Sequence, residues 1–208
     1  MIIGDVVRSR RAPAAAGEWL RRLTRDLNEA YGSQRLAPFA FTQGDELQGL
    51  LRVEADPLRA ILLAGLDPGG LEMRWAVAAG AVATGRGRAT ERSGEAFFLA
   101  RELIRSLARS REGLVIRTGA ASRDELLDDL APLLAELLGE LTPRQREIAS
   151  LALIVGLRQA DVAERLGVSR ATISVTWSRS RVRSIERLAS ALRTLFSAGV
   201  AEAAGAAS

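Results

Sequence analysis

One stretch near the C-terminus, residues 161–174, restricts the possible folds more than any other part of the 208-residue chain. It reads Asp-Val-Ala-Glu-Arg-Leu-Gly-Val-Ser-Arg-Ala-Thr-Ile-Ser. Gly167 interrupts a helical pattern where the backbone needs a left-handed conformation, and Ser169 is of a type that caps a following helix. Small Ala163 lets two helices cross closely, and Ile173 supplies apolar cover for the crossing. The stretch therefore predicts two helices joined by a tight turn.

Another helix is expected just before this pair. Thr142 followed by Pro143 is typical of a helix start, and Gly156 is typical of a helix end. After Ser169, apolar residues continue at helical spacing, which predicts one long helix to Phe196. Its last apolar residues lie beyond a small three-helix core and are expected at a dimer or interdomain contact: Leu188, Leu192, Leu195 and Phe196. Residues 140–197 are thus predicted to form an all-α helix-turn-helix domain.

The 161–174 stretch resembles the helix-turn-helix of the sigma-factor region-four and LuxR-like families, in which the helix after the turn enters the major groove of DNA. The resemblance implies which residues contact double-stranded DNA. Base edges would be contacted by Arg170, Ala171, Thr172, Ser174 and Val175, and the backbone by Ser169, Arg179, Arg181 and Arg183. The alternative is a helical bundle that binds a protein partner.

Charge is distributed unevenly along the chain. Residues 1–138 hold 19 Arg and 19 acidic residues, whereas residues 139–208 hold 10 Arg and 6 acidic residues, which accounts for the whole net charge of +4. A cationic segment at one end of a neutral chain suggests a polyanionic partner. The alternative explanation of this excess is a helix face whose arginines are simply exposed to solvent.

Composition excludes several kinds of chemistry. The chain has no Cys and no His, so disulfides, Cys/His zinc sites and a Ser-His-Asp triad are impossible. No cationic leader precedes a long apolar run, and no uninterrupted apolar run reaches the roughly 18 residues of a membrane span. We therefore expect a cytoplasmic protein. The absence of Lys beside abundant Ala, Gly and Leu indicates a GC-rich bacterial genome.

The first 119 residues alternate between short apolar runs and amphipathic segments. Strands are expected at residues 2–7, 36–42, 47–53, 72–84 and 114–117, and helices at 18–31, 57–66 and 94–110. The order predicts an α+β fold, with helices packed on one face of the sheet. We expect a helix capped by Ser122 to connect the domains over residues 120–139, with apolar residues Leu126, Leu130, Leu133, Leu134, Leu137 and Leu138. Residues 198–208 are expected to be a flexible tail.

Three acidic residues in this N-terminal domain suggest a ligand site. Asp5 ends the first strand, and Asp45 and Glu46 lie in the turn of a predicted hairpin. If that strand lies beside the hairpin, the carboxylates converge at one edge of the sheet, where a divalent cation would offset their repulsion and grip a nucleotide. Structural roles as turn or helix caps are the alternative.

This pattern resembles the palm-like, ferredoxin-like domain of class III nucleotide cyclases and GGDEF diguanylate cyclases, in which an Asp on the first strand and an acid in the hairpin hold magnesium. A closer resemblance is to the SatD family, carried by Gly4-Asp5-Val6-Val7-Arg8-Ser9-Arg10 and Gly44-Asp45-Glu46-Leu47-Gln48. The resemblance implies Mg or Mn with a nucleotide. The absence of Lys removes the purine-reading lysine of active cyclases, and no clear match exists for their catalytic arginine, so we assign no catalytic residue.

Three functions follow from these features. The favoured hypothesis is a DNA-binding transcriptional regulator, a homodimer whose N-terminal domain senses a nucleotide or mediates dimerisation. A nucleotidyl cyclase-like enzyme with an accessory helix-turn-helix is the second hypothesis. A non-catalytic DNA-binding scaffold is the third.

Overall fold

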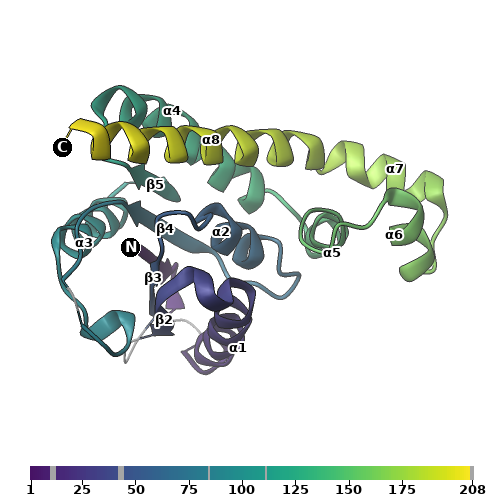
Figure 1. Cartoon of the computed structure of the whole chain (residues 1–208). Helices are drawn as coiled ribbons and strands as arrows, with labels where there is room; N and C mark the ends of the chain where they lie inside the picture. The colour runs from purple at the N-terminus through teal and green to yellow at the C-terminus, as the bar shows by residue number, and fades with distance from the viewer. Residues whose placement is uncertain (10–12, 42–44, 84, 111, 207–208) are drawn as a thin grey trace.

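The computed structural model describes residues 1–9, 13–41, 45–83, 85–110 and 112–206 (Figure 1). Arg10 and Gly44, which belong to the motifs named above, lie outside the described residues. Within the described ranges, no helix combines the length and the apolar character needed to cross a membrane. The described residues include the 3-10 helices η2 (Gly32–Gln34) and η3 (Ala89–Glu91).

Five strands form a mixed sheet in the order β2-β3-β1-β4-β5. They are β1 (Ile2–Val6), β2 (Arg35–Phe41), β3 (Glu46–Leu51), β4 (Met73–Ala78) and β5 (Leu114–Arg117). All neighbouring strands are antiparallel except β4 and β5. The connections from β1 to β2 and from β3 to β4 each skip one strand, which is the split βαβ arrangement of ferredoxin-like folds. The predicted α+β class and the predicted β2–β3 hairpin are confirmed.

The sheet carries helices on both faces, so the prediction of helices on one face is wrong. Helices α1 (Pro13–Tyr31) and α2 (Leu58–Gly65) cover one face, and α3 (Glu95–Leu107) covers the other (Figure 1). Side chains alternate along β1, so that Ile2 packs with the α1 and α2 cluster and Ile3 with the α3 cluster. Because both side chains are apolar, both faces need cover.

Helices α4 (Ala121–Gly139) and α8 (Val182–Ala206) pack against each other and extend the core of the sheet. The residues that they bury in this core are Leu127, Ala131, Leu134, Leu138, Val182, Ile185, Ala189, Leu192 and Phe196. The sequence predicts Leu192 and Phe196 at a dimer contact or at an interdomain contact. Within this chain they lie at the interdomain contact, because they pack into the core of the sheet. Two members of the predicted apolar stripe of α4, Leu126 and Leu133, are instead 45% exposed. The residues that follow them, Leu127 and Leu134, face the core and are fully buried.

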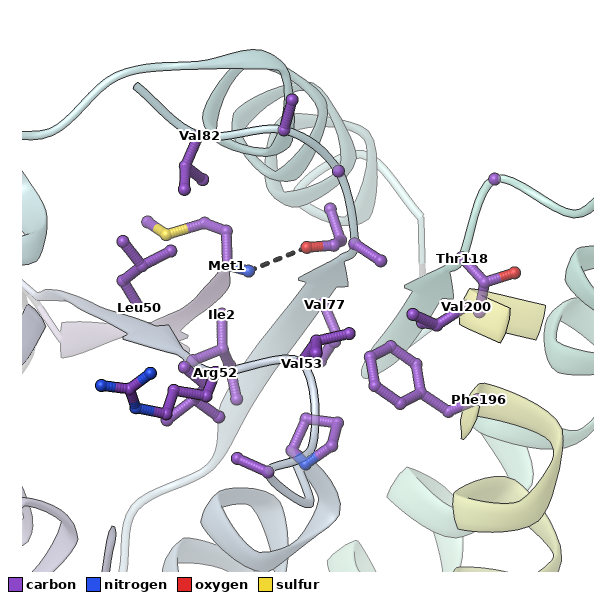
Figure 2. Close-up of a pocket in the computed structure, with 18 of the residues that line it drawn as sticks. Met1, Ile2, Leu50, Arg52, Val53, Val77, Val82, Thr118, Phe196 and Val200 are labelled. Atoms are coloured by element: carbon purple, nitrogen blue, oxygen red, sulfur yellow. Dashed lines mark hydrogen bonds between the residues drawn. The ribbon is translucent and has the colours of Figure 1, made fainter. Parts of the chain in front are cut away.

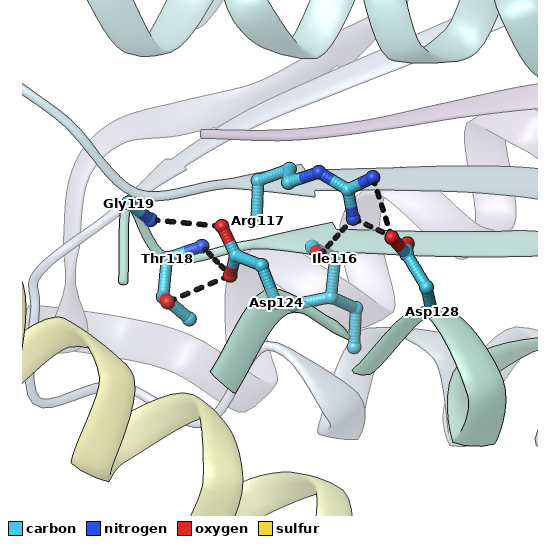
Figure 3. A network of polar contacts seen from close by, with 6 residues as sticks. All are labelled: Ile116, Arg117, Thr118, Gly119, Asp124 and Asp128. Atoms are coloured by element: carbon cyan, nitrogen blue, oxygen red, sulfur yellow. Dashed lines mark hydrogen bonds and ion pairs between the residues drawn. The ribbon is translucent and has the colours of Figure 1, made fainter. Parts of the chain in front are cut away.

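A polar network holds the start of α4 against β5 (Figure 3). The Asp124 carboxylate accepts hydrogen bonds from the Thr118 backbone N–H at 2.8 Å and the Thr118 hydroxyl at 2.7 Å. Arg117 makes an ion pair with Asp128 one turn further on. Ser122 was expected to cap this helix, but the helix begins one residue earlier and the Ser122 hydroxyl donates to Glu202 at 3.3 Å.

The C-terminal module contains α5 (Pro143–Leu153), α6 (Gln159–Arg165) and α7 (Arg170–Arg179). The predicted continuous helix from Ser169 to Phe196 is interrupted, since α7 ends at Arg179 and α8 begins at Val182. Arg181 lies in the break with a left-handed φ of 51°. The described part of the expected flexible tail, residues 198–206, continues α8 as helix. Gly199 packs so closely on Thr118 that any side chain there would collide with it.

Candidate DNA-binding surface

Local capping interactions place the helices of this module. Thr142 and Gln145 form a capping box at the start of α5, in which the Gln145 side chain accepts a hydrogen bond from the Thr142 N–H at 2.9 Å. Between α6 and α7, Gly167 has a φ of 63°. Ser169 then caps α7, because its hydroxyl accepts a hydrogen bond from the Thr172 N–H at 3.1 Å. The turn at Gly167 and the two caps predicted for this module, Thr142 and Ser169, are present.

A small apolar core fixes the orientation of α7. Its buried members are Ile148 of α5, Val162 and Ala163 of α6, and Ile173 of α7. The Val168 N–H donates to the Ala163 carbonyl at 3.0 Å, which holds the turn against α6. Ile173 is the buried residue of α7 and Trp177 is partly buried beside it, so the exposed residues of the first turns are directed away from the core.

The residues predicted to contact DNA all lie on the surface. Every one of the nine is exposed: Ser169, Arg170, Ala171, Thr172, Ser174, Val175, Arg179, Arg181 and Arg183. Val175 is 51% exposed, which is unusual for a large apolar side chain. An exposed mixture of cationic, hydroxyl and small apolar side chains on one helix has the chemistry needed to read base edges and thymine methyl groups.

Three arginines surround the break between α7 and α8. The Arg181 guanidinium lies 3.6 Å from the Glu140 carboxylate, and both side chains are more than half exposed. The buried Ser180 hydroxyl donates to the Thr176 carbonyl at 2.7 Å, which closes the last turn of α7. The break therefore directs Arg179, Arg181 and Arg183 to the surface at the end of α7.

Sequence reasoning missed the contacts that attach this module to the sheet. Arg146 of α5 donates to the Gly70 carbonyl at 3.0 Å, and Arg193 of α8 makes an ion pair with Asp56 before α2. Trp177 of α7 packs against both the small core and the core of the sheet. No local pattern marks these contacts. Arg146 is 76 residues from Gly70 along the chain, and Arg193 is 137 residues from Asp56.

The acidic residues of the N-terminal module come together as expected. Asp5 and Glu46 are direct partners across β1 and β3, and burial with the Asp45 carboxylate nearby raises the pKa of Asp5 from 3.8 to about 6. Arg74 opposes this shift, with its guanidinium 3.7 Å from the Asp5 carboxylate. The Ser9 hydroxyl donates to Asp45.

These carboxylates do not by themselves form a metal site. In the described ranges, no group of three or more acidic side chains is arranged to hold a metal ion. A cation beside Asp5 would compete with Arg74 and would need further oxygen ligands, which nucleotide phosphates supply.

Residues 132–183 match the family described as Sigma-70, region 4. The matched range begins within α4 and contains α5, α6, the turn and α7. No curated protein and no solved structure was found to match the chain. The prediction of a sigma-region-four helix-turn-helix, a DNA-binding element, is thus confirmed for this part of the chain. The resemblance of the N-terminal module to the SatD family and to cyclase palms stays a prediction.

Proposed function

We propose that the chain is a DNA-binding transcriptional regulator, in which α7 reads the major groove. One observation carries this proposal: the segment that matches Sigma-70 region 4 presents all nine predicted contact residues to solvent. The excess of arginine over acidic residues lies in the same part of the chain. Such an excess supports attraction to the phosphate backbone.

The contacts proposed for α7 divide into two kinds. Arg170, Thr172 and Ser174, in its first turns, are proposed to contact base edges. Arg179, Arg181 and Arg183 are proposed to contact phosphates, which position the helix without reading sequence. A cytoplasmic location belongs to this proposal.

The sheet module is proposed to regulate the helix-turn-helix. The shared core of α4 and α8 supports a mechanical link between them. A homodimer is proposed as well, because dimeric helix-turn-helix proteins read two half-sites about one turn of DNA apart. Light scattering of the purified protein, alone and with DNA, tests the oligomeric state.

The decisive experiment compares Arg170→Ala with Arg25→Ala on a duplex selected from a random pool by the wild-type protein. Arg25 is a matched control, since its side chain is 72% exposed on the sheet module. Removing a base contact costs about 1–3 kcal/mol, so Arg170→Ala should weaken specific binding by about 5- to 150-fold. Arg25→Ala should bind as the wild type does. Equal affinity of Arg170→Ala and wild type would exclude Arg170 as a reader of sequence.

A second candidate function is binding of a nucleotide with Mg or Mn at Asp5, Asp45 and Glu46. The convergence of these carboxylates, with the raised pKa of Asp5, favours it. Calorimetry with Mn²⁺ and ATP or GTP should show binding that Asp5→Asn and Asp45→Asn abolish. Chromatography of the same mixtures tests the cyclase-like alternative, because turnover would yield a new nucleotide product.

A further inference from the structure

A cavity of about 590 Å³ lies between the sheet and the C-terminal part of α8 (Figure 2). It is at the end of the sheet where β3 and β4 finish, whereas Asp5 lies toward the end of β1. Figure 2 shows Phe196 and Val200 of α8 on one side, with the Phe196 ring directed toward Val77 of β4 and Val53. The volume is within the range of about 300–1,000 Å³ that is usual for small-molecule sites.

The lining of the cavity is mainly aliphatic. Leu50, Val77, Phe196 and Val200 come from three elements that are far apart along the chain. The Thr118 hydroxyl, one of its polar groups, already donates to Asp124 at 2.7 Å. A cavity of this lining favours an apolar occupant over a charged one, because a buried charge without a partner is costly.

Three titratable groups of the lining do not change this preference. The N-terminal amine of Met1 donates to the Ala78 carbonyl at 2.8 Å, and burial lowers its pKa from 8.0 to about 5, which favours the neutral amine. Arg52 and Glu95 are both exposed, and the Arg52 Nε–H donates to the Ser33 carbonyl at 3.0 Å. Charges in contact with water contribute little to holding an ionic ligand. The cavity thus suits an uncharged, mainly apolar molecule.

The wall formed by α8 leads directly to the DNA-binding surface. This helix has 25 residues, which is about 37 Å of rigid structure, and its first residues follow the break after α7. Val182 and Ile185, near its start, belong to the same apolar cluster as Phe196, and the neighbouring Trp177 of α7 packs against this cluster. A displacement of α8 at the cavity would therefore reach the packing of the recognition helix.

We propose that this cavity is an effector site for an uncharged, mainly apolar small molecule, and that its occupation changes DNA affinity through α8. The second half of this inference rests on the DNA-binding function proposed above. A ligand that prefers one position of α8 shifts the equilibrium between positions, and the coupling between the two sites is reciprocal.

The first test measures saturable binding of the uncharged fluorescent dye Nile red to the full chain. Ala203→Trp fills the cavity from α8, and Val53→Arg adds a much longer side chain at a lining position that is 62% exposed, so that its bulk narrows the cavity. Ala201→Trp is the control, on an exposed residue of the same helix that does not line the cavity. We expect at least tenfold weaker binding for the first two variants and wild-type binding for the control.

Either of two results overturns the site: no saturable binding by the wild type, or wild-type affinity in a variant of the cavity that circular dichroism shows to be folded. Val53→Arg keeps the test decisive if the bulk introduced by Ala203→Trp disturbs folding, because Val53 is largely exposed.

The second test measures DNA affinity with and without saturating Nile red. The dissociation constant of the wild type should change by at least about fivefold, the lower end of usual allosteric coupling. Ala203→Trp should shift it in the same direction without dye, and Ala201→Trp should not. An unchanged constant overturns the effector role and leaves the proposed function intact. Failure of the dye-free wild type to bind DNA contradicts the proposed function instead.

Discussion

The helix-turn-helix is built around four buried side chains, whereas the sheet module buries apolar residues on both faces of five strands. The small core joins neighbouring helices, while the core of the sheet joins segments from β1 to α8. The two regions also differ in charge, since the excess of arginine is confined to residues 139–208. The difference indicates that the DNA-binding part depends on its neighbour for stability, because so few buried side chains stabilise little by themselves.

The joint between the regions supports this dependence. Trp177 packs against both apolar clusters, and Arg146 and Arg193 reach from the helical part to Gly70 and Asp56. Local opening of the small core, with the sheet still folded, is therefore the expected first step of unfolding.

The largest effect is expected from Ile173→Ala. The side chain is fully buried at the centre of the small core, and truncation of a buried Ile costs about 2–5 kcal/mol. Hydrogen exchange measured by mass spectrometry should accelerate in residues 143–179 and stay unchanged in β1 and β4. Equal acceleration in both regions would show that they unfold as one unit.

Asp5→Asn should affect the sheet module in a pH-dependent way. The pKa of Asp5 is raised to about 6 in the folded chain, so the folded state binds the proton more tightly than the unfolded state does. Ionisation of Asp5 therefore destabilises the fold as the pH rises from about 4 to 6, and the penalty persists above that. The shift of about 2 units corresponds to at most about 3 kcal/mol, less solvent screening at a side chain that is 28% exposed.

Urea unfolding from pH 4 to pH 8 measures this effect. The stability of Asp5→Asn relative to wild type should increase through this range, and an NMR titration of the wild-type carboxyl should give a midpoint near 6. A gap between the two proteins that stays constant with pH would contradict the buried, acid-surrounded environment of Asp5.

Thr142→Ala should weaken only the helical part. It removes the hydroxyl that caps α5, at a cost of about 1 kcal/mol. Thr194→Ala is the matched control, because Thr194 is exposed within α8 and its hydroxyl bonds to the Ser190 carbonyl of its own helix. Hydrogen exchange in α5 should increase in the first variant only. A similar increase in both would show that the capping box contributes nothing particular.

The smallest effect on stability is expected from Arg181→Gly. Glycine relieves the left-handed φ of 51°, and the exposed ion pair with Glu140 that is lost is worth little, so the free energy of unfolding should change by less than about 1 kcal/mol. If Arg181 contacts a phosphate, the slope of DNA affinity against salt should fall by about 1. An unchanged slope would remove Arg181 from the DNA surface.

The helix-turn-helix was largely predictable because its signals are local. Thr142, Pro143, Gly167 and Ser169 act on the backbone within a few residues of themselves, so their effect can be read from the chain. The convergence of Asp5 and Asp45 was also predicted, because strand ends and hairpin turns limit where such residues lie. The prediction of one continuous helix after Ser169 is wrong. The apolar residues keep their helical spacing through the break at Arg181, so the spacing alone does not reveal the break.

The amino-acid sequence by itself thus determined the two-helix turn at residues 161–174 and the α+β class of the first 119 residues. Only the tertiary structure decided that α3 covers the second face of the sheet, that α8 returns to the sheet, and that a cavity forms beneath Phe196 and Val200. The physical reason is that these features depend on packing between segments far apart in the chain, where many apolar surfaces are chemically equivalent and only their shapes select the partner.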